Sequence, residues 1–134
     1  MNNEVLQSVL AEYFAPWVQA LALKVELFDS DSVTLRLPRN PQLSRVGGML
    51  CGQAMMAAAD TAMALAIANQ SGAFRPCTTV QMSTSFFKPL SNQDALVQAR
   101  LLRSGKSLAF GEIDIRGAED GKSVSRASAT YALL

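Results

Sequence analysis

Histidine is absent from this chain of 134 residues. Its absence excludes a Ser-His-Asp triad, a Cys-His pair and any zinc site with a histidine ligand. Acid–base chemistry near neutral pH is therefore left to a carboxylate, a cysteine, a lysine or a tyrosine. We expect neither a metal ion nor a cofactor.

Cysteine and clustered charge are also scarce. The two cysteines, Cys51 and Cys77, are too few for a disulfide framework, which favours a reducing compartment such as the cytoplasm. The 12 Lys and Arg residues nearly balance the 11 Asp and Glu residues. Because nucleic-acid binding relies on clustered basic side chains, we expect no nucleic-acid partner. The first residues lack the basic and then apolar pattern of a secretion signal, so we expect none.

Apolar residues are plentiful, at 49% of the chain, and their densest run follows Gly52. About fifteen residues there are almost all Ala, Met, Leu and Ile, which are strong helix formers. A helix that is apolar on every side is expected to be buried. Asp60 interrupts this run, and a buried carboxylate that is charged and unpaired costs on the order of several kcal/mol.

Asp60 has structural interpretations as well as a functional one. It can cap a helix N-terminus, although no Gly or Pro precedes it to mark a break, or it can form an ion pair with a buried Arg. A membrane span is disfavoured because the apolar run is shorter than about 20 residues and carries a charge, so we expect no membrane contact. The functional interpretation is a working carboxylate in a dry site, where burial makes it more basic.

Hydrophobic periodicity predicts an amphipathic helix at about residues 3–14, which Pro16 ends or kinks, and the long apolar helix at 54–70. Residues 38–46 are predicted to form a loop. Strands are predicted at residues 23–28, 33–37, 78–87, 95–103, 108–115 and 123–134. The turns between the last four strands indicate an antiparallel meander.

We therefore predict a single α+β domain over residues 1–134, in which an antiparallel sheet of about six strands wraps around one long central helix. The many alanines let the helix and the sheet approach closely. The sheet cannot cover every side of an apolar helix. The uncovered side is therefore predicted to contact another subunit.

Three segments support a family resemblance. Residues 51–53, Cys-Gly-Gln, lie at a loop-to-helix junction shortly before Asp60. Residues 78–89 end in an aromatic residue, a basic residue and Pro, and residues 104–108 contain a Gly turn. Together they resemble the hotdog-fold thioesterases, especially the acyl-CoA thioesterases of the phenylacetic-acid-degradation type, in which His-Gly-Gly precedes an Asp in the buried helix.

This resemblance implies hydrolysis of a small-molecule acyl-CoA in a homodimer or a dimer of dimers. Asp60 would be the general base or the nucleophile, and the backbone N–H of Gly52 would donate to the thioester oxygen. Eight residues of one helix separate these two residues, or about 12 Å along its axis. One thioester carbon cannot reach both within one chain, so we expect each site to combine two subunits.

Two positions depart from the family pattern, because Cys51 replaces the His and Gln53 replaces the second Gly. Cys51 can be a small apolar filler or, less plausibly, a nucleophile activated at a helix N-terminus. The missing His disfavours a related hydratase, which uses an Asp and His pair. It also motivates an alternative function, a non-catalytic protein that binds acyl-CoA or acyl groups on the same scaffold.

Four further residues are predicted to bind substrate, each with a structural alternative. Thr78 or Thr79 can orient the nucleophile or simply occupy a strand. Gln53 can bind the ligand or the first turn of the helix. Lys88 can meet the phosphates of coenzyme A, as can other basic residues, or it can be a solvated surface charge. These other residues are Arg45, Arg75, Arg103 and Lys106.

Overall fold

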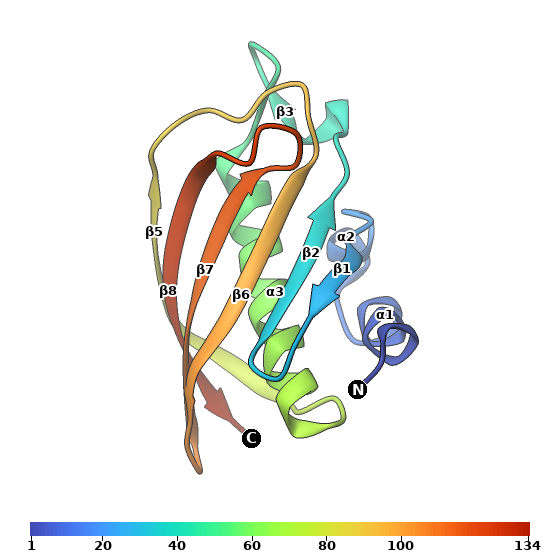
Figure 1. Ribbon diagram of the computed structural model, residues 1–134, viewed down its shortest axis with the longest axis vertical. Coiled ribbons are helices and arrows are strands. Elements are labelled where there is room, and N and C mark those ends of the chain that lie inside the picture. The colour runs from blue at the N-terminus through green and yellow to red at the C-terminus, as the bar shows by residue number, and fades with distance from the viewer.

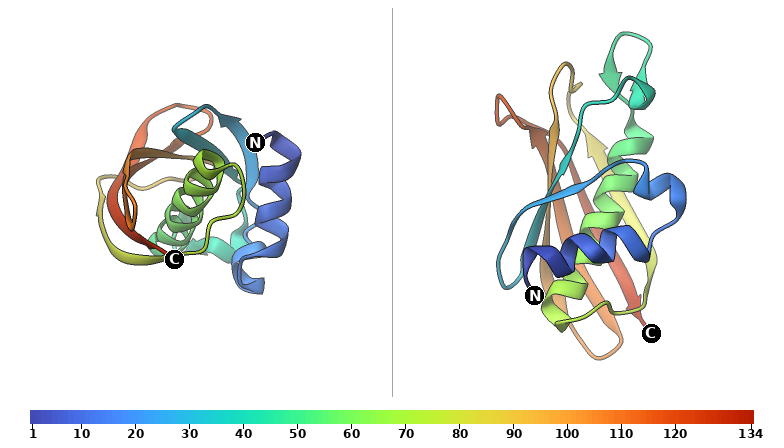
Figure 2. Two further views of the ribbon diagram at one scale, coloured as in Figure 1. Left: turned by 90° about the horizontal axis from the view of Figure 1, so that it is seen from below. Right: turned by 90° about the vertical axis from the view of Figure 1, so that its right-hand side faces the viewer.

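The computed structural model describes residues 1–134, and its six-stranded sheet curves around one long helix (Figures 1 and 2). The helices are α1 (Asn3–Glu12), α2 (Pro16–Gln19), the 3-10 helix η1 (Pro41–Leu43) and α3 (Gly52–Ser71). The strands are β1 (Lys24–Phe28), β2 (Ser32–Leu37), β3 (Ser44–Arg45), β4 (Met49–Leu50), β5 (Cys77–Phe86), β6 (Ala95–Ser104), β7 (Leu108–Gly117) and β8 (Ser123–Leu133). This α+β arrangement is the hotdog fold, as predicted.

The apolar run forms α3, which packs against β2, β6 and β7 on the concave side of the sheet. The helix ends at Gly72, whose φ of 81° is left-handed and suits glycine. Its side toward the sheet is fully buried. Its other side is less buried and carries Gln53, Met56, Ala57, Asp60 and Ala64. No helix of the structure is both long enough and apolar enough to span a bilayer.

The helix and the sheet approach most closely at Gly111 of β7. A Cβ atom on Gly111 would overlap the buried Met63 side chain of α3 and lie 2.9 Å from the Arg100 carbonyl oxygen of β6. The glycine therefore makes room for the methionine. Met63 therefore fills the core between the helix and the sheet.

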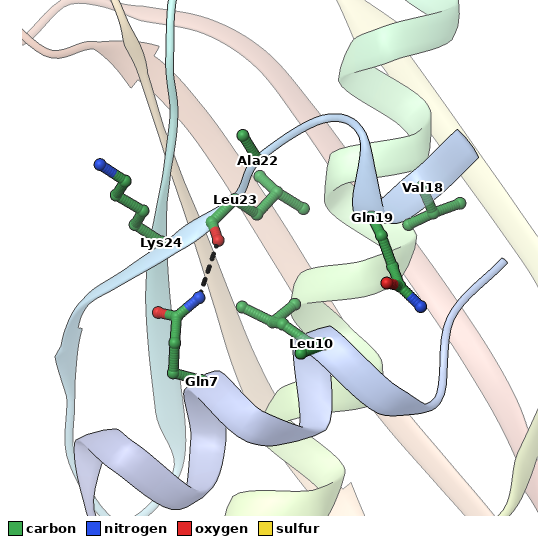
Figure 3. Close-up of a pocket in the computed structure, with 8 residues that line it drawn as sticks. Gln7, Leu10, Val18, Gln19, Ala22, Leu23 and Lys24 are labelled. Atoms are coloured by element: carbon green, nitrogen blue, oxygen red, sulfur yellow. Dashed lines mark hydrogen bonds between the residues drawn. The ribbon is translucent and has the colours of Figure 1, made fainter. Parts of the chain in front are cut away.

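The two edges of the sheet differ. The sheet order is β1-β2-β6-β7-β8-β5, with every neighbouring pair antiparallel. At the β1 edge, the side-chain amide of Gln7 on α1 donates to the Leu23 carbonyl at 3.1 Å (Figure 3). The Gln7 side-chain oxygen accepts from the Val25 N–H at 3.1 Å. Helix α1 thus occupies this edge. Strand β5 pairs only with β8, and its other side is a free edge.

The predicted four-strand meander is wrong in one respect, because β5 pairs with β8 and not with β6. Only β6, β7 and β8 form a meander. The connection from β5 to β6 spans residues 87–94, which is longer than a hairpin loop of about two to five residues. It crosses one end of the sheet instead, which places β6 beside β2 (Figure 1).

Four short elements were not predicted: α2, η1, β3 and β4. Pro16 begins α2, because its missing N–H and fixed φ suit the first position of a helix. The predicted loop at 38–46 contains η1 and β3, and β3 pairs with β4 across a turn. Gly47 and Gly48 make that turn with φ values of 100° and 79°, which suit glycine.

Candidate active site

Asp60 lies on the less buried side of α3 and lines a cavity of about 190 Å³. The wall is built from three parts of the chain. The N-terminal part contributes Phe14 after α1 together with Trp17 and Val18 of α2. Helix α3 contributes Ala57, Asp60, Thr61 and Ala64, and the strands contribute Cys77, Thr79 and Tyr131. We call this space the Asp60 cavity. It holds one carboxylate in largely apolar surroundings.

Two hydroxyl groups from the sheet hold the Asp60 carboxylate. The Thr79 hydroxyl on β5 donates to Oδ1 at 2.7 Å, and the Tyr131 hydroxyl on β8 donates to the same oxygen at 2.5 Å. The side chain is therefore neither a helix cap nor half of an ion pair. Of the two threonines considered from the sequence, Thr79 is the one that contacts Asp60, and Tyr131 is an addition.

Two titratable groups next to Asp60, Tyr131 and Cys77, have raised pKa values. Burial raises the pKa of Tyr131 far above its usual value, and the adjacent Asp60 carboxylate raises it further. Burial also raises the pKa of the half-buried Cys77 thiol; Asp60 adds to this shift and Arg75 opposes it. The phenol and the thiol are consequently neutral at neutral pH, and Tyr131 remains a hydrogen-bond donor.

Gly52 lies in a second space, a groove of about 450 Å³ that we call the Gly52 groove. Its lining is Arg45, Met49, Leu50, Gly52, Met55, Phe86, Phe87, Lys88 and Pro89. The first hydrogen bond of α3 runs from the Met55 N–H to the Cys51 carbonyl at 3.2 Å. The Gly52 amide therefore has no acceptor within the helix and carries the partial positive charge of a helix N-terminus.

Three of the predicted binding residues lie outside both spaces. Cys51 is the half-buried N-cap residue of α3, and its thiol makes no capping hydrogen bond. Gln53 is exposed on the first turn of α3. Thr78 is exposed on β5 and directly precedes Thr79. Because neighbouring residues of a strand point to opposite faces of the sheet, Thr78 points away from Asp60. Of the predicted binding residues, Thr79 lies with Asp60 and Lys88 lies with Gly52.

The Asp60 cavity and the Gly52 groove share no lining residue. Strand β5 runs between them, with Cys77 and Thr79 near its start in the cavity and Phe86 at its end in the groove. The cavity and the groove thus lie at opposite ends of an exposed strand.

The family profile of the Thioesterase superfamily matches residues 47–124, more than half of the chain. The chain belongs to this superfamily. An esterase-named protein of Thermoplasma acidophilum is 23% identical over 116 residues, which cover 86% of each chain. A solved structure from Silicibacter sp. TM1040, named as a thioesterase, superposes with a TM-score of 0.89 at 27% identity over 100% of this chain and 92% of that one. A thioesterase structure from Haemophilus influenzae gives 0.88 at 19% identity over 100% and 91%.

Several residues of the Asp60 cavity lie outside the part of the chain that the superfamily profile matches. Phe14 and Trp17 precede residue 47, and Tyr131 follows residue 124. Sequence reasoning missed all three. The apolar spacing of the first helix predicted packing against the body of the protein, but no local signal tied Phe14 or Trp17 to Asp60. Tyr131 is 71 residues from its partner and looks like any aromatic strand residue.

Proposed function

We propose that this superfamily member is a thioester hydrolase acting on acyl-CoA, assembled as a homodimer or a dimer of dimers. Each site would combine Asp60 of one subunit with the Gly52 amide of another. The observation that carries the proposal is the separation of the two halves within one subunit. Asp60 and Gly52 lie eight residues apart on α3, which is about 12 Å along the axis, and they line different spaces.

The free edge of β5 offers a way to join the halves. If two copies pair through this edge in antiparallel fashion, the start of one β5 lies beside the end of the other. The Asp60 cavity of each subunit then faces the Gly52 groove of its partner. A two-fold axis creates two such sites at once. The opposite edge is unsuited to pairing because Gln7 already occupies backbone groups of β1.

The two halves suit thioester hydrolysis. Negative charge develops on the carbonyl oxygen, where the free Gly52 N–H would stabilise it. Asp60 would take a proton from water while the water oxygen bonds to the carbonyl carbon. The carbon–sulfur bond then breaks, and the sulfur leaves and gains the proton. In the alternative route Asp60 attacks the carbon itself, the carbon–sulfur bond breaks and the coenzyme A thiolate leaves. Water then hydrolyses the resulting anhydride to the free acid and regenerates Asp60.

The lining of each space indicates where the two parts of the substrate would lie. Arg45 and Lys88 border an otherwise largely apolar Gly52 groove, which suits the phosphates and linear arm of coenzyme A. The acyl group would enter the Asp60 cavity beside Trp17. A cavity of about 150 Å³ accepts benzene, so a space of about 190 Å³ fits a compact acyl group better than a long chain.

Hydrolysis of a panel of acyl-CoA thioesters by the wild type and by Asp60→Asn tests the proposal. We expect turnover by the wild type and a large loss of kcat in the variant with little loss of binding, because the amide is neither a base nor a carboxylate nucleophile. Wild-type protein that binds acyl-CoA without hydrolysing it would instead support the binding-protein alternative. Full activity in Asp60→Asn would refute the assignment of Asp60.

A further inference from the structure

The contact between Tyr131 and Asp60 joins the last strand to the central helix at the one carboxylate of the cavity. Tyr131 is only 1% exposed, and its hydroxyl lies 2.5 Å from Asp60 Oδ1 and 3.3 Å from the Asp60 carbonyl oxygen. A buried phenol needs an acceptor. Here the better acceptor is an ionisable group that lines a cavity, rather than a structural carbonyl.

The two hydroxyl donors converge on one oxygen of the carboxylate. Thr79 and Tyr131 approach from different strands, and both donate to Oδ1. No side chain donates to Oδ2. The two oxygens are therefore unequal, since Oδ1 is anchored to the sheet and Oδ2 keeps its lone pairs free.

We propose that Tyr131 is a positioning residue that acts with Thr79 to anchor Oδ1 of Asp60, so that Oδ2 is the oxygen that meets the water or the thioester carbon. This inference rests on the proposed hydrolase function. It holds for either chemical route, because a general base and a nucleophile both need one oxygen with free lone pairs. Fixing the carboxylate against the sheet also removes rotamers in which Oδ2 would face away from the substrate.

The chemistry of the donors suits this task. A phenol and an alcohol both donate to a carboxylate oxygen and thereby hold it in one orientation. Tyr131 keeps its proton throughout the neutral range because burial and the neighbouring charge oppose its ionisation. It is therefore a permanent donor and not a second base. Both acceptors of the buried hydroxyl are oxygens of Asp60, so the phenol is directed at this one residue.

The chain supplies a matched control for the key variant. It contains two tyrosines, and Tyr13 is 53% exposed with its ring stacked on Phe74. Tyr131→Phe and Tyr13→Phe each delete one hydroxyl and keep the ring. A second pair, Thr79→Val and Thr79→Ser, deletes or retains the other donor. This pair decides the question if Tyr131→Phe fails to fold.

Steady-state kinetics on the preferred acyl-CoA test the inference. Loss of a hydrogen bond to a charged group should lower kcat about tenfold to a hundredfold in Tyr131→Phe and Thr79→Val, with little change in KM. Thr79→Ser keeps the hydroxyl and should therefore lose much less kcat than Thr79→Val. Tyr13→Phe should keep the wild-type kcat and KM.

Two results would overturn the inference, and they have different meanings. If the wild type hydrolyses acyl-CoA but Tyr131→Phe and Thr79→Val keep its kcat, the proposed function stands and the positioning role is wrong. If the wild type hydrolyses no thioester, the proposed function fails, and the inference that rests on it fails as well.

Discussion

Replacement of Gly52 by proline tests the proposed oxyanion donor by removing one hydrogen atom from the site. Proline has no backbone N–H, so Gly52→Pro deletes the donor outright. The position tolerates the change because Gly52 is the first residue of α3, where proline is favoured. The preceding Cys51 has φ −73° and ψ 150°, an extended conformation that a residue before proline already prefers. The first intrahelical bond starts at Met55, so no structural hydrogen bond is lost.

The magnitude follows from the role of the amide. Loss of one oxyanion donor typically lowers kcat about 10²- to 10³-fold, or roughly 3–4 kcal/mol of transition-state stabilisation. Gly52→Ala is the matched control because it adds a Cβ and keeps the N–H. That Cβ would lie 3.4 Å from the Phe86 ring, which is van der Waals contact without a clash. We therefore expect Gly52→Ala to lose much less activity than Gly52→Pro.

The assay is release of free coenzyme A under steady-state conditions, with thermal unfolding measured on the same preparations. The comparison of interest is kcat of Gly52→Pro against kcat of Gly52→Ala. If both variants fold and their kcat values agree within about threefold, the Gly52 amide does not stabilise the transition state. The oxyanion donor would then have to be sought elsewhere in the groove.

Three further predictions address the assembly, the packing and the response to pH. Equal amounts of Asp60→Asn and Gly52→Pro protein should recover about one quarter of wild-type activity once their subunits have exchanged. About half of the randomly formed dimers contain one subunit of each variant, and each of these dimers has one intact site out of two. No recovery of activity in proven mixed dimers would contradict a shared site. Gly111→Ala should lower the free energy of unfolding by about 1–3 kcal/mol in denaturant titrations, because the added methyl overlaps Met63, whereas Gly105→Ala in an exposed turn should change it far less. The Arg39 N–H and, more weakly, the Arg36 guanidinium lower the pKa of Asp94, so its charged form stabilises the fold at neutral pH. Asp94→Asn should therefore have a lower free energy of unfolding than the wild type at pH 7, and the difference should narrow as the pH falls below about 4. A difference that does not depend on pH would refute this.

The sequence predicted those features that are encoded locally. The apolar run around Asp60 predicted a buried helix, and alternating residues marked the strands to within a few positions, as in β6 at Ala95–Ser104. Turn residues located the ends of helices and strands, including Gly72 at the end of α3. Local patterns also placed Gly52 at the first turn of a helix, where its amide is free.

Features that depend on pairing across the chain were not predictable in this way. Strand β5 carries the pattern of a strand, but nothing in that pattern says that it pairs with β8 and lies at an edge. The partners of Asp60 come from β5 and β8, so the same ambiguity hid Tyr131. Trp17 reaches the cavity only because α1 and α2 fold back over the α3 helix.

The exposure of Asp60 connects the fold to the proposed assembly. The sequence suggested a carboxylate buried on every side, yet within one subunit Asp60 is only half-buried, on the side of α3 that the sheet leaves uncovered. Two hydroxyl donors hold it there, but they do not exclude water. A site that excludes water makes a carboxylate more basic and strengthens the electrostatic interaction between an oxyanion donor and the developing negative charge. In the proposed dimer the partner subunit supplies this missing wall together with the Gly52 amide, so one contact would complete the geometry of the site and remove its water.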